Sequence, residues 1–190
     1  MTMAKLTKVL AAAVLVASVA PCWAAGEGKA MSELEGEWSG SGTDRDRPFQ
    51  SMQKVTCHSK IRADHRNMSN EIVCTGSGVR KTTHMKVILE GTQLTGEVVQ
   101  TKTTPREPAQ TRKGTVSGIR TGNSADVQIS FPMTPSARSR MVVHDASSYS
   151  IKVEALGALL MDVTFKRVGP PKEKEAKQTG QESKQAETQQ

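Results

Sequence analysis

The stretch that most constrains the fold is residues 34–43, where apolar and polar positions alternate without interruption. Every odd position holds a polar residue. Every even position holds an apolar residue or a glycine: Leu34, Gly36, Trp38, Gly40 and Gly42. This period of two is typical of a β-strand that buries one face. The indole of Trp38 would anchor a core, while the glycines on its face permit strong coiling or close approach of another backbone. The sequence therefore predicts that this stretch opens a small barrel.

The same alternation recurs along the chain, with turn residues such as Gly91, Gly122 and Pro132 between the segments. The further segments are 55–61, 68–76, 83–89, 94–98, 114–119, 125–131, 141–143, 149–153 and 159–166. Residues 154–160 are compatible with either a helical turn or a simple connection at Gly157. Short strands at a spacing of roughly 8 to 12 residues, without a clear amphipathic helix, predict an all-β fold. We expect an antiparallel up-and-down β-barrel of about 8–10 strands.

Cys57 and Cys74 are the only cysteines after the N-terminal leader, and each lies in one of two neighbouring alternating segments. If the two cysteines face each other, Asp64 faces Asn67 across a two-residue turn. Turn chemistry and a disulfide thus agree on one strand register. Exported proteins meet an oxidising compartment, so we expect this disulfide to form. There is no Cys-x-x-Cys motif, which favours a structural role over a redox role.

Residues 1–24 have the pattern of a secretory signal peptide. Lys5 and Lys8 precede an unbroken apolar run over residues 9–16, and the segment ends at Ala24 after small residues. The run is shorter than the roughly 20 residues that a membrane-spanning helix needs. An alternative is a bacterial lipoprotein signal that uses Cys22, although Pro21 replaces the small residue normal before such a cysteine. The predicted location is periplasmic or secreted, with no transmembrane segment after leader cleavage.

The rest of the chain is predicted to contain one folded domain and one tail. The domain covers residues 32–168. Residues 169–190 contain no aromatic side chain and no aliphatic side chain larger than alanine, so we expect a disordered polar tail. Loss of Lys5 and Lys8 with the leader reduces the 26 Lys and Arg residues to 24, against 19 Asp and Glu. The mature chain is therefore basic, at +5.

The basic excess is concentrated in residues 44–66 and 80–120, whereas residues 25–43 are net negative. One interpretation is a basic patch for an anionic partner such as cell-envelope phosphate or acidic polysaccharide. The other is that cations on polar strand faces keep the sheet soluble and its edges unpaired. The basic segments lack the interleaved aromatic residues that stack on bases, so we expect no nucleic-acid partner.

The sequence contains no recognisable catalytic or metal-binding motif. The four histidines, His58, His65, His84 and His144, are isolated and form no metal-ligand spacing. His144 and Asp145 lie next to two serines, but no nucleophile elbow is present, and solvation of a loop explains the pair better. The sequence therefore predicts a protein that is not an enzyme, with no metal site and no cofactor.

The motif Gly36-x-Trp38 in the first strand resembles the lipocalin and calycin superfamily. A closer similarity is to lipocalin-like small exported β-barrel proteins of unknown function from alphaproteobacteria, and it covers roughly residues 32–168. It rests on Leu-x-Gly-x-Trp-x-Gly, a cysteine in each of the next two strands, and the later strands at 94–96 and 114–118. The resemblance implies that the first strand closes the base of the barrel. It also implies that Lys166 or Arg167, near the end of the last strand, packs on Trp38.

The lipocalin strand that carries Thr-Asp-Tyr has no counterpart here, which argues against a large open ligand cup. Six methionines, at positions 52, 68, 85, 133, 141 and 161, either line an adaptable cavity or fill an irregular core. We expect an exported non-catalytic binding protein that holds a small apolar ligand in the barrel or an anionic cell-envelope component on its basic strands. The alternative is an envelope protein-interaction factor or inhibitor that acts through loops and tail.

Overall fold

The computed structural model describes residues 32–169. The predicted signal peptide, Cys22 and all of the predicted tail except Gly169 lie outside the described residues. Within the described range the chain forms ten β-strands, and each alternating segment of the sequence corresponds to one of them, although Leu34, Glu35 and Phe131 lie outside the strands. The strands are β1 (Gly36–Asp44), β2 (Gln53–Ala63), β3 (Asn67–Gly76), β4 (Val79–Glu90), β5 (Gln93–Thr103), β6 (Gln110–Thr121), β7 (Ser124–Ser130), β8 (Ala137–Asp145), β9 (Ser148–Ala155) and β10 (Ala158–Arg167).

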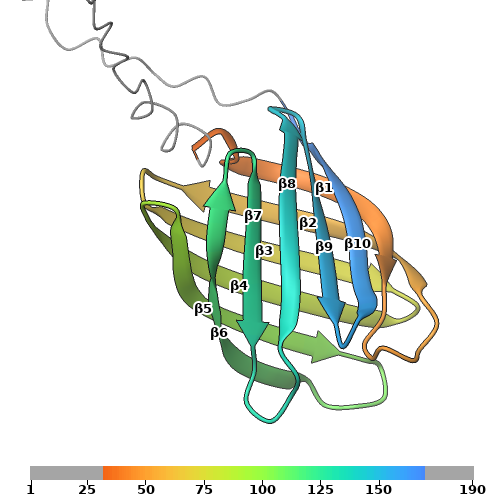
Figure 1. Cartoon of the computed structure of the whole chain (residues 1–190). Helices are drawn as coiled ribbons and strands as arrows, with labels where there is room; N and C mark the ends of the chain where they lie inside the picture. The colour runs from red at the N-terminus through yellow and green to blue at the C-terminus, as the bar shows by residue number, and fades with distance from the viewer. Residues whose placement is uncertain (1–31, 170–190) are drawn as a thin grey trace, which may run out of the picture.

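The strands close into a single antiparallel barrel. Each strand pairs with the next in sequence, and β1 also pairs with β10, with Trp38 opposite Arg167 and Asp44 opposite Met161. The all-β, up-and-down barrel predicted from the alternation is therefore confirmed (Figure 1). Because the strands run alternately up and down, the β1–β2, β3–β4, β5–β6, β7–β8 and β9–β10 connections all lie at one end. The other four connections lie at the opposite end.

The β2–β3 hairpin has the predicted register. Cys57 pairs with Cys74 in the ladder, and the two form a disulfide. The backbone N–H of Asp64 donates to the carbonyl of Asn67 at 2.9 Å, which closes the turn. The predicted disulfide is thus confirmed, and it suggests that the protein folds outside the cytoplasm.

The inward faces of the strands form one core, which contains Trp38, Ile61, Val98, Tyr149 and Phe165 among its most buried side chains. Ser32 and Glu33 have helical backbone just before β1. Among residues 32–169, no helix combines the length and the apolar character needed to cross a membrane.

The connection between β9 and β10 is a two-residue hairpin turn. Ala155 faces Ala158, and between them Leu156 and Gly157 have φ values of 51° and 73°. Two consecutive positive φ angles are the signature of a type I′ turn, which matches the twist of antiparallel strands. The Gly157 connection, one of the two alternatives for residues 154–160, is therefore the observed one.

Candidate functional site

Arg167 seals the end of the barrel at which the N-terminal segment enters. Its guanidinium lies over the Trp38 ring, 4.2 Å from the ring centroid. The structure places Arg167, and not the exposed Lys166, on the tryptophan. Gly36 makes room for this contact, because a Cβ at that position would lie 2.6 Å from Nη1 of Arg167. The guanidinium donates to three backbone carbonyls, those of Ala146 (2.8 Å), Glu35 (2.6 Å) and Glu33.

An aromatic layer lies directly behind this seal. The Trp38 and Tyr149 rings meet edge to face with centroids 4.8 Å apart, and Tyr149 stacks on Phe165 at 4.6 Å. The Phe165 ring occupies space left by Gly40, where a Cβ would lie 2.7 Å from it. Trp38 Nε1 donates to the carbonyl of Leu34 at 3.0 Å. We call this the closed end of the barrel, since aromatic rings fill its cross-section.

A short chain of hydrogen bonds crosses the interior beside the aromatic layer. The Tyr149 hydroxyl donates to Ser59 Oγ at 2.8 Å, and Ser59 Oγ donates to Asn70 Oδ1 at 2.8 Å. All three side chains are buried. Burial raises the pKa of Tyr149 well above its usual value, although the contact with Ser59 opposes the shift, so the phenol stays neutral. Asn70 Nδ2 has no hydrogen-bond partner within residues 32–169.

Beyond this layer, toward the opposite end, the barrel interior is not filled. A partly open cavity of about 140 Å³ lies among inward-facing side chains from β3 to β10. Its walls are largely apolar: Ile72, Met85, Val98, Ile129, Phe131, Ala137, Ile151, Val153, Leu160 and Met161. Met85 and Met161 thus line a cavity, whereas Met68 is part of the filled core and Met133 is exposed. Both roles that the sequence left open are therefore present, and Met133 has neither.

Charged residues separate this cavity from a second hollow near the end of the barrel. Asp44, Arg45 and Asp46 border both the cavity and a hollow of about 430 Å³ below the β1–β2 connection. Lys81 Nζ lies 2.5 Å from Asp44 Oδ2 and 3.0 Å from Asp46 Oδ1. Lys102 Nζ lies 2.5 Å from Asp46 Oδ2. We call the end that carries this cluster the open end.

The two carboxylates of the cluster respond differently to their surroundings. Burial raises the pKa of Asp44, and the charge and hydrogen bond of Lys81 only partly offset this effect. Burial also acts on Asp46, but hydrogen bonds from Lys102 and Lys81 outweigh it and lower the pKa of Asp46. Each lysine therefore has an acidic partner within the cluster.

Arg45 and Arg112 both border the cavity without an ion pair to a carboxylate among residues 32–169, but Arg45 donates to the backbone carbonyls of Leu159 and Gln50. Arg112 lies on β6. Its Nε and Nη2 donate to Gln100 Oε1 at 2.9 and 2.5 Å, and its guanidinium lies 4.1 Å from the centroid of the Phe131 ring. It makes no ion pair with any carboxylate among residues 32–169. Burial lowers the pKa of Arg112, against the attraction of Asp46, so the cation lies in a partly dehydrated position.

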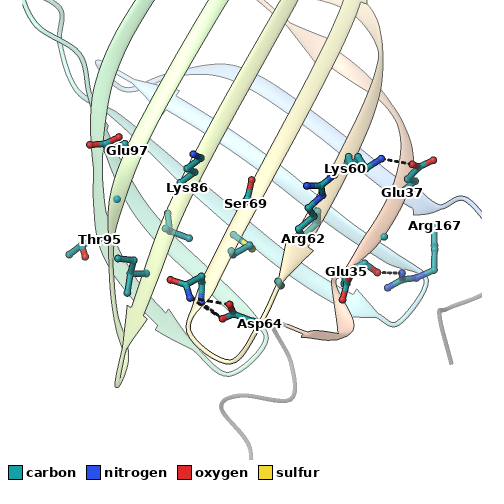
Figure 2. A pocket seen from close by; sticks show the side chains of 18 of the residues that line it. Glu35, Glu37, Lys60, Arg62, Asp64, Ser69, Lys86, Thr95, Glu97 and Arg167 are labelled. Carbon is teal, nitrogen blue, oxygen red and sulfur yellow. Dashed lines mark hydrogen bonds and ion pairs between the residues drawn. The ribbon is translucent and has the colours of Figure 1, made fainter. Parts of the chain in front are cut away.

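A larger groove of about 1160 Å³ lies on the outer surface over β1 to β6, and Figure 2 shows the side chains along it. Its charges are balanced between Glu35, Glu37, Asp64 and Glu97 on one side and Lys60, Arg62, Lys86 and Arg167 on the other. The ion pair between Lys60 and Glu37 spans 3.1 Å, and both side chains are more than half exposed, so it adds little stability. The groove has neither one sign of charge nor a continuous apolar lining. We therefore place the candidate site inside the barrel.

The histidines and acidic residues do not converge on a reactive site. His144 Nε2 lies 3.0 Å from Ser150 Oγ, whereas Asp145 accepts hydrogen bonds from the backbone and hydroxyl of Ser147. His144 and Asp145 thus have separate partners. In the part of the chain that the structure describes, no three His, Cys, Asp or Glu side chains gather in a way that could hold a metal ion.

The cavity and its charged border are features that inspection of the sequence missed. The only sequence signal for them is the alternation of inward and outward residues along each strand. It puts Lys81 on the inward face of β4 with Thr83 and Met85, and Lys102 on the inward face of β5 with Val98. Fold and site together define a closed ten-stranded barrel with one sealed end and a small apolar cavity below a charged mouth. No protein-family model, curated protein or solved structure matches the chain.

Proposed function

We propose that this is an exported, non-catalytic binding protein whose barrel holds a small apolar molecule with one anionic group. The observation that carries the proposal is the largely apolar, partly open cavity with Arg112 on its wall, a cation that has no acidic partner among residues 32–169. An apolar cavity of roughly 150 Å³ can stay dry and bind benzene. A cavity of about 140 Å³ therefore suits a ligand with a single ring or a short branched chain.

The charges at the mouth favour an anion over a neutral ligand. The guanidinium of Arg112 is held over Phe131 by Gln100, with Nη1 still free of hydrogen bonds to residues 32–169. Arginine binds carboxylates through paired N–H donors with good geometry. Asp44 and Asp46 would repel an anion, but Lys81 and Lys102 neutralise them. A carboxylate at the mouth would thus face a net positive site while its apolar part fills the cavity.

Isothermal titration calorimetry with para-toluate and the neutral para-toluamide tests the proposal. We expect para-toluate to bind and to release heat at one site per chain. Arg112→Gln should weaken para-toluate binding at least about tenfold, since a hydrogen bond to a charged group contributes about 1.5–3 kcal/mol. The same substitution should leave the weaker binding of para-toluamide unchanged.

Arg62→Gln is the matched control, because Arg62 borders the outer groove and not the cavity. Native mass spectrometry of the purified protein gives a second reading, since a retained ligand would add mass. If para-toluate and para-toluamide both fail to bind, and no ligand mass is retained, the proposed function is wrong.

A further inference from the structure

Three connections at the open end each present a large apolar side chain to solvent. Phe49 in the β1–β2 connection is 97% exposed, Met133 between β7 and β8 is fully exposed, and Leu156 between β9 and β10 is 70% exposed. The remaining exposed large apolar residues in the described range, Ile88, Ile119 and Val168, are only about half exposed. We call Phe49, Met133 and Leu156 the apolar tips. Figure 1 shows that the connections that carry them lie at the same end of the barrel.

Two of the apolar tips also have an unfavourable backbone conformation. Met133 has φ of 60° and Leu156 has φ of 51°, a region where glycine and asparagine are favoured. Each position thus combines a backbone cost with the cost of exposing a large apolar group to water. The exposure of these two side chains is not explained by packing within the described chain, which points to a contact outside it.

Positive charge is concentrated at the same end of the barrel as the apolar tips. The open end, defined as residues 44–54, 76–81, 102–113, 131–138 and 154–159, contains ten Lys and Arg residues and four Asp and Glu residues. The rest of residues 32–169 contains nine Lys and Arg against ten Asp and Glu. The open end is therefore +6, whereas the remainder of the described barrel is −1.

Seven of the ten open-end cations have no acidic partner within residues 32–169, and five of these seven do not border the cavity. Arg47, Lys54, Arg80, Arg106 and Lys113 are exposed and make no ion pair within residues 32–169. Their charges are therefore available to an external anion. They come from three of the segments that make up the open end, residues 44–54, 76–81 and 102–113, and not from one strand.

We propose that the open end docks on an anionic lipid surface. Isolated apolar side chains on separate turns, surrounded by unpaired cations, match a bilayer interface, where apolar groups enter the acyl boundary and cations approach lipid phosphates. A stable protein interface relies on anchor side chains that cluster near its centre, whereas the tips are on separate turns. Docking in this orientation turns the charged mouth of the cavity toward the membrane. Docking on the membrane does not require the cavity to hold a ligand.

Vesicle flotation with the mature protein tests this proposal. We expect binding to vesicles of equimolar phosphatidylcholine and phosphatidylglycerol, and much weaker binding to vesicles of phosphatidylcholine alone. Added salt should weaken binding, since it screens the attraction. Equal binding to both vesicle types, or no binding to either, overturns the proposal.

Two sets of variants separate the apolar and the cationic contributions. The triple variant Phe49→Ser, Met133→Asn, Leu156→Asn should reduce partitioning onto anionic vesicles at least tenfold. Its control replaces the other exposed apolar residues, Ile88, Ile119 and Val168, with serine. The triple variant Arg47→Gln, Arg80→Gln, Arg106→Gln should reduce partitioning on the order of a hundredfold, because each cation near an anionic surface contributes roughly fivefold.

The control for the charge variant removes three cations far from the open end: Arg62, Arg66 and Lys86. If this control loses as much binding as the open-end variant, the vesicles do not bind the open end in preference to the rest of the barrel, and the proposal fails.

A fluorescent reporter gives the orientation directly. Phe49→Trp should show a blue shift on anionic vesicles, whereas Ile119→Trp near the closed end should not, and the buried Trp38 supplies a constant background in both. A blue shift of the Ile119 reporter, or none at position 49, contradicts docking through the open end. These readouts use vesicles without a cavity ligand, so their outcome is separate from that of the titrations with para-toluate.

Discussion

Trp38 makes three interactions that depend on its indole ring. It lies under Arg167, meets the edge of Tyr149 and donates to the Leu34 carbonyl, with 1% of its surface exposed. Trp38→Ala should therefore lower the free energy of unfolding by roughly 3 to 5 kcal/mol in denaturant titrations. Trp38→Phe keeps an aromatic ring and should cost less. Native emission of the single tryptophan after the leader should be blue-shifted, and emission like that of indole in water would contradict its burial.

Asp64 organises the β2–β3 turn through its carboxylate. It accepts hydrogen bonds from the Asn67 side-chain amide and from the backbone N–H groups of Asn67 and Arg66, and these lower its pKa to about 2 from the ordinary value of 3.8. Because the pKa is lower in the folded state, the carboxylate stabilises the fold above the unfolded pKa of 3.8. That contribution is lost as the pH falls toward about 2.

Asp64→Asn should consequently have a lower melting temperature than the wild type at neutral pH. The difference should shrink as the pH falls toward about 2, where the wild-type carboxyl is protonated as well. A carbon-detected NMR titration of Asp64 measures the pKa directly. A normal value, or a difference in melting temperature that does not change with pH, would contradict the role of these hydrogen bonds.

At the scale of elements, the β2–β3 hairpin combines a buried disulfide with a ladder from Thr56–Thr75 to Ala63–Met68. The cysteines are 17 residues apart, and closing a loop of about this length contributes on the order of 3 kcal/mol. The double variant Cys57→Ser, Cys74→Ser should therefore melt at a markedly lower temperature. Intact mass after alkylation, with and without reduction, checks that the exported protein has no free thiol. Two free thiols in that form would contradict the bridge.

The β9–β10 turn offers a substitution that should raise stability, whereas the variants above should lower it. Asparagine is preferred over leucine at the first position of a type I′ turn, where Leu156 has φ of 51°. Leu156→Asn should raise stability by about 1 kcal/mol, the scale of the penalty for a non-glycine residue in this region. Leu156→Val should lower stability, because a β-branched side chain tolerates positive φ poorly. If the asparagine variant is less stable than the wild type, the leucine packs in a way that its exposure does not show.

Elements were predicted well where local chemistry decides them. Alternation placed the strands, because a half-buried strand must alternate, and Asp64-x-x-Asn67 with the two cysteines fixed one register. Residues 154–160 were ambiguous because alanine and leucine favour a helix there, while Gly157 favours a turn. The structure shows that cross-strand pairing of Ala155 with Ala158 decides between them.

The whole barrel determines the site, and for this reason the sequence did not reveal it. Asp46 meets Lys102 across 56 residues, and Tyr149 meets Ser59 across 90. Both contacts exist only because β1 pairs with β10 and closes the sheet. The sequence showed a basic excess in residues 44–66 and 80–120, but only the alternating strand directions collect nine of its fourteen cations at one end. Long-range placement of this kind has no local signature.

The empty space in the barrel can be tested by filling it. Ala137 of β8 faces the cavity, next to Ile129 of β7. Ala137→Leu adds an isopropyl group that the cavity of about 140 Å³ can accommodate, so we expect stability to be unchanged or higher. The same variant should lose affinity for para-toluate at least tenfold, because ligand and side chain compete for one volume.

Ala109→Leu is the matched control, since Ala109 is exposed in the β5–β6 connection and does not border the cavity. It should leave both stability and para-toluate affinity unchanged. A loss of more than about 2 kcal/mol for Ala137→Leu would indicate that no free volume exists there, because overpacking a filled core typically costs about 1–3 kcal/mol. A stable Ala137→Leu variant with undiminished affinity would instead place para-toluate outside the barrel, and the cavity would then not be the binding site.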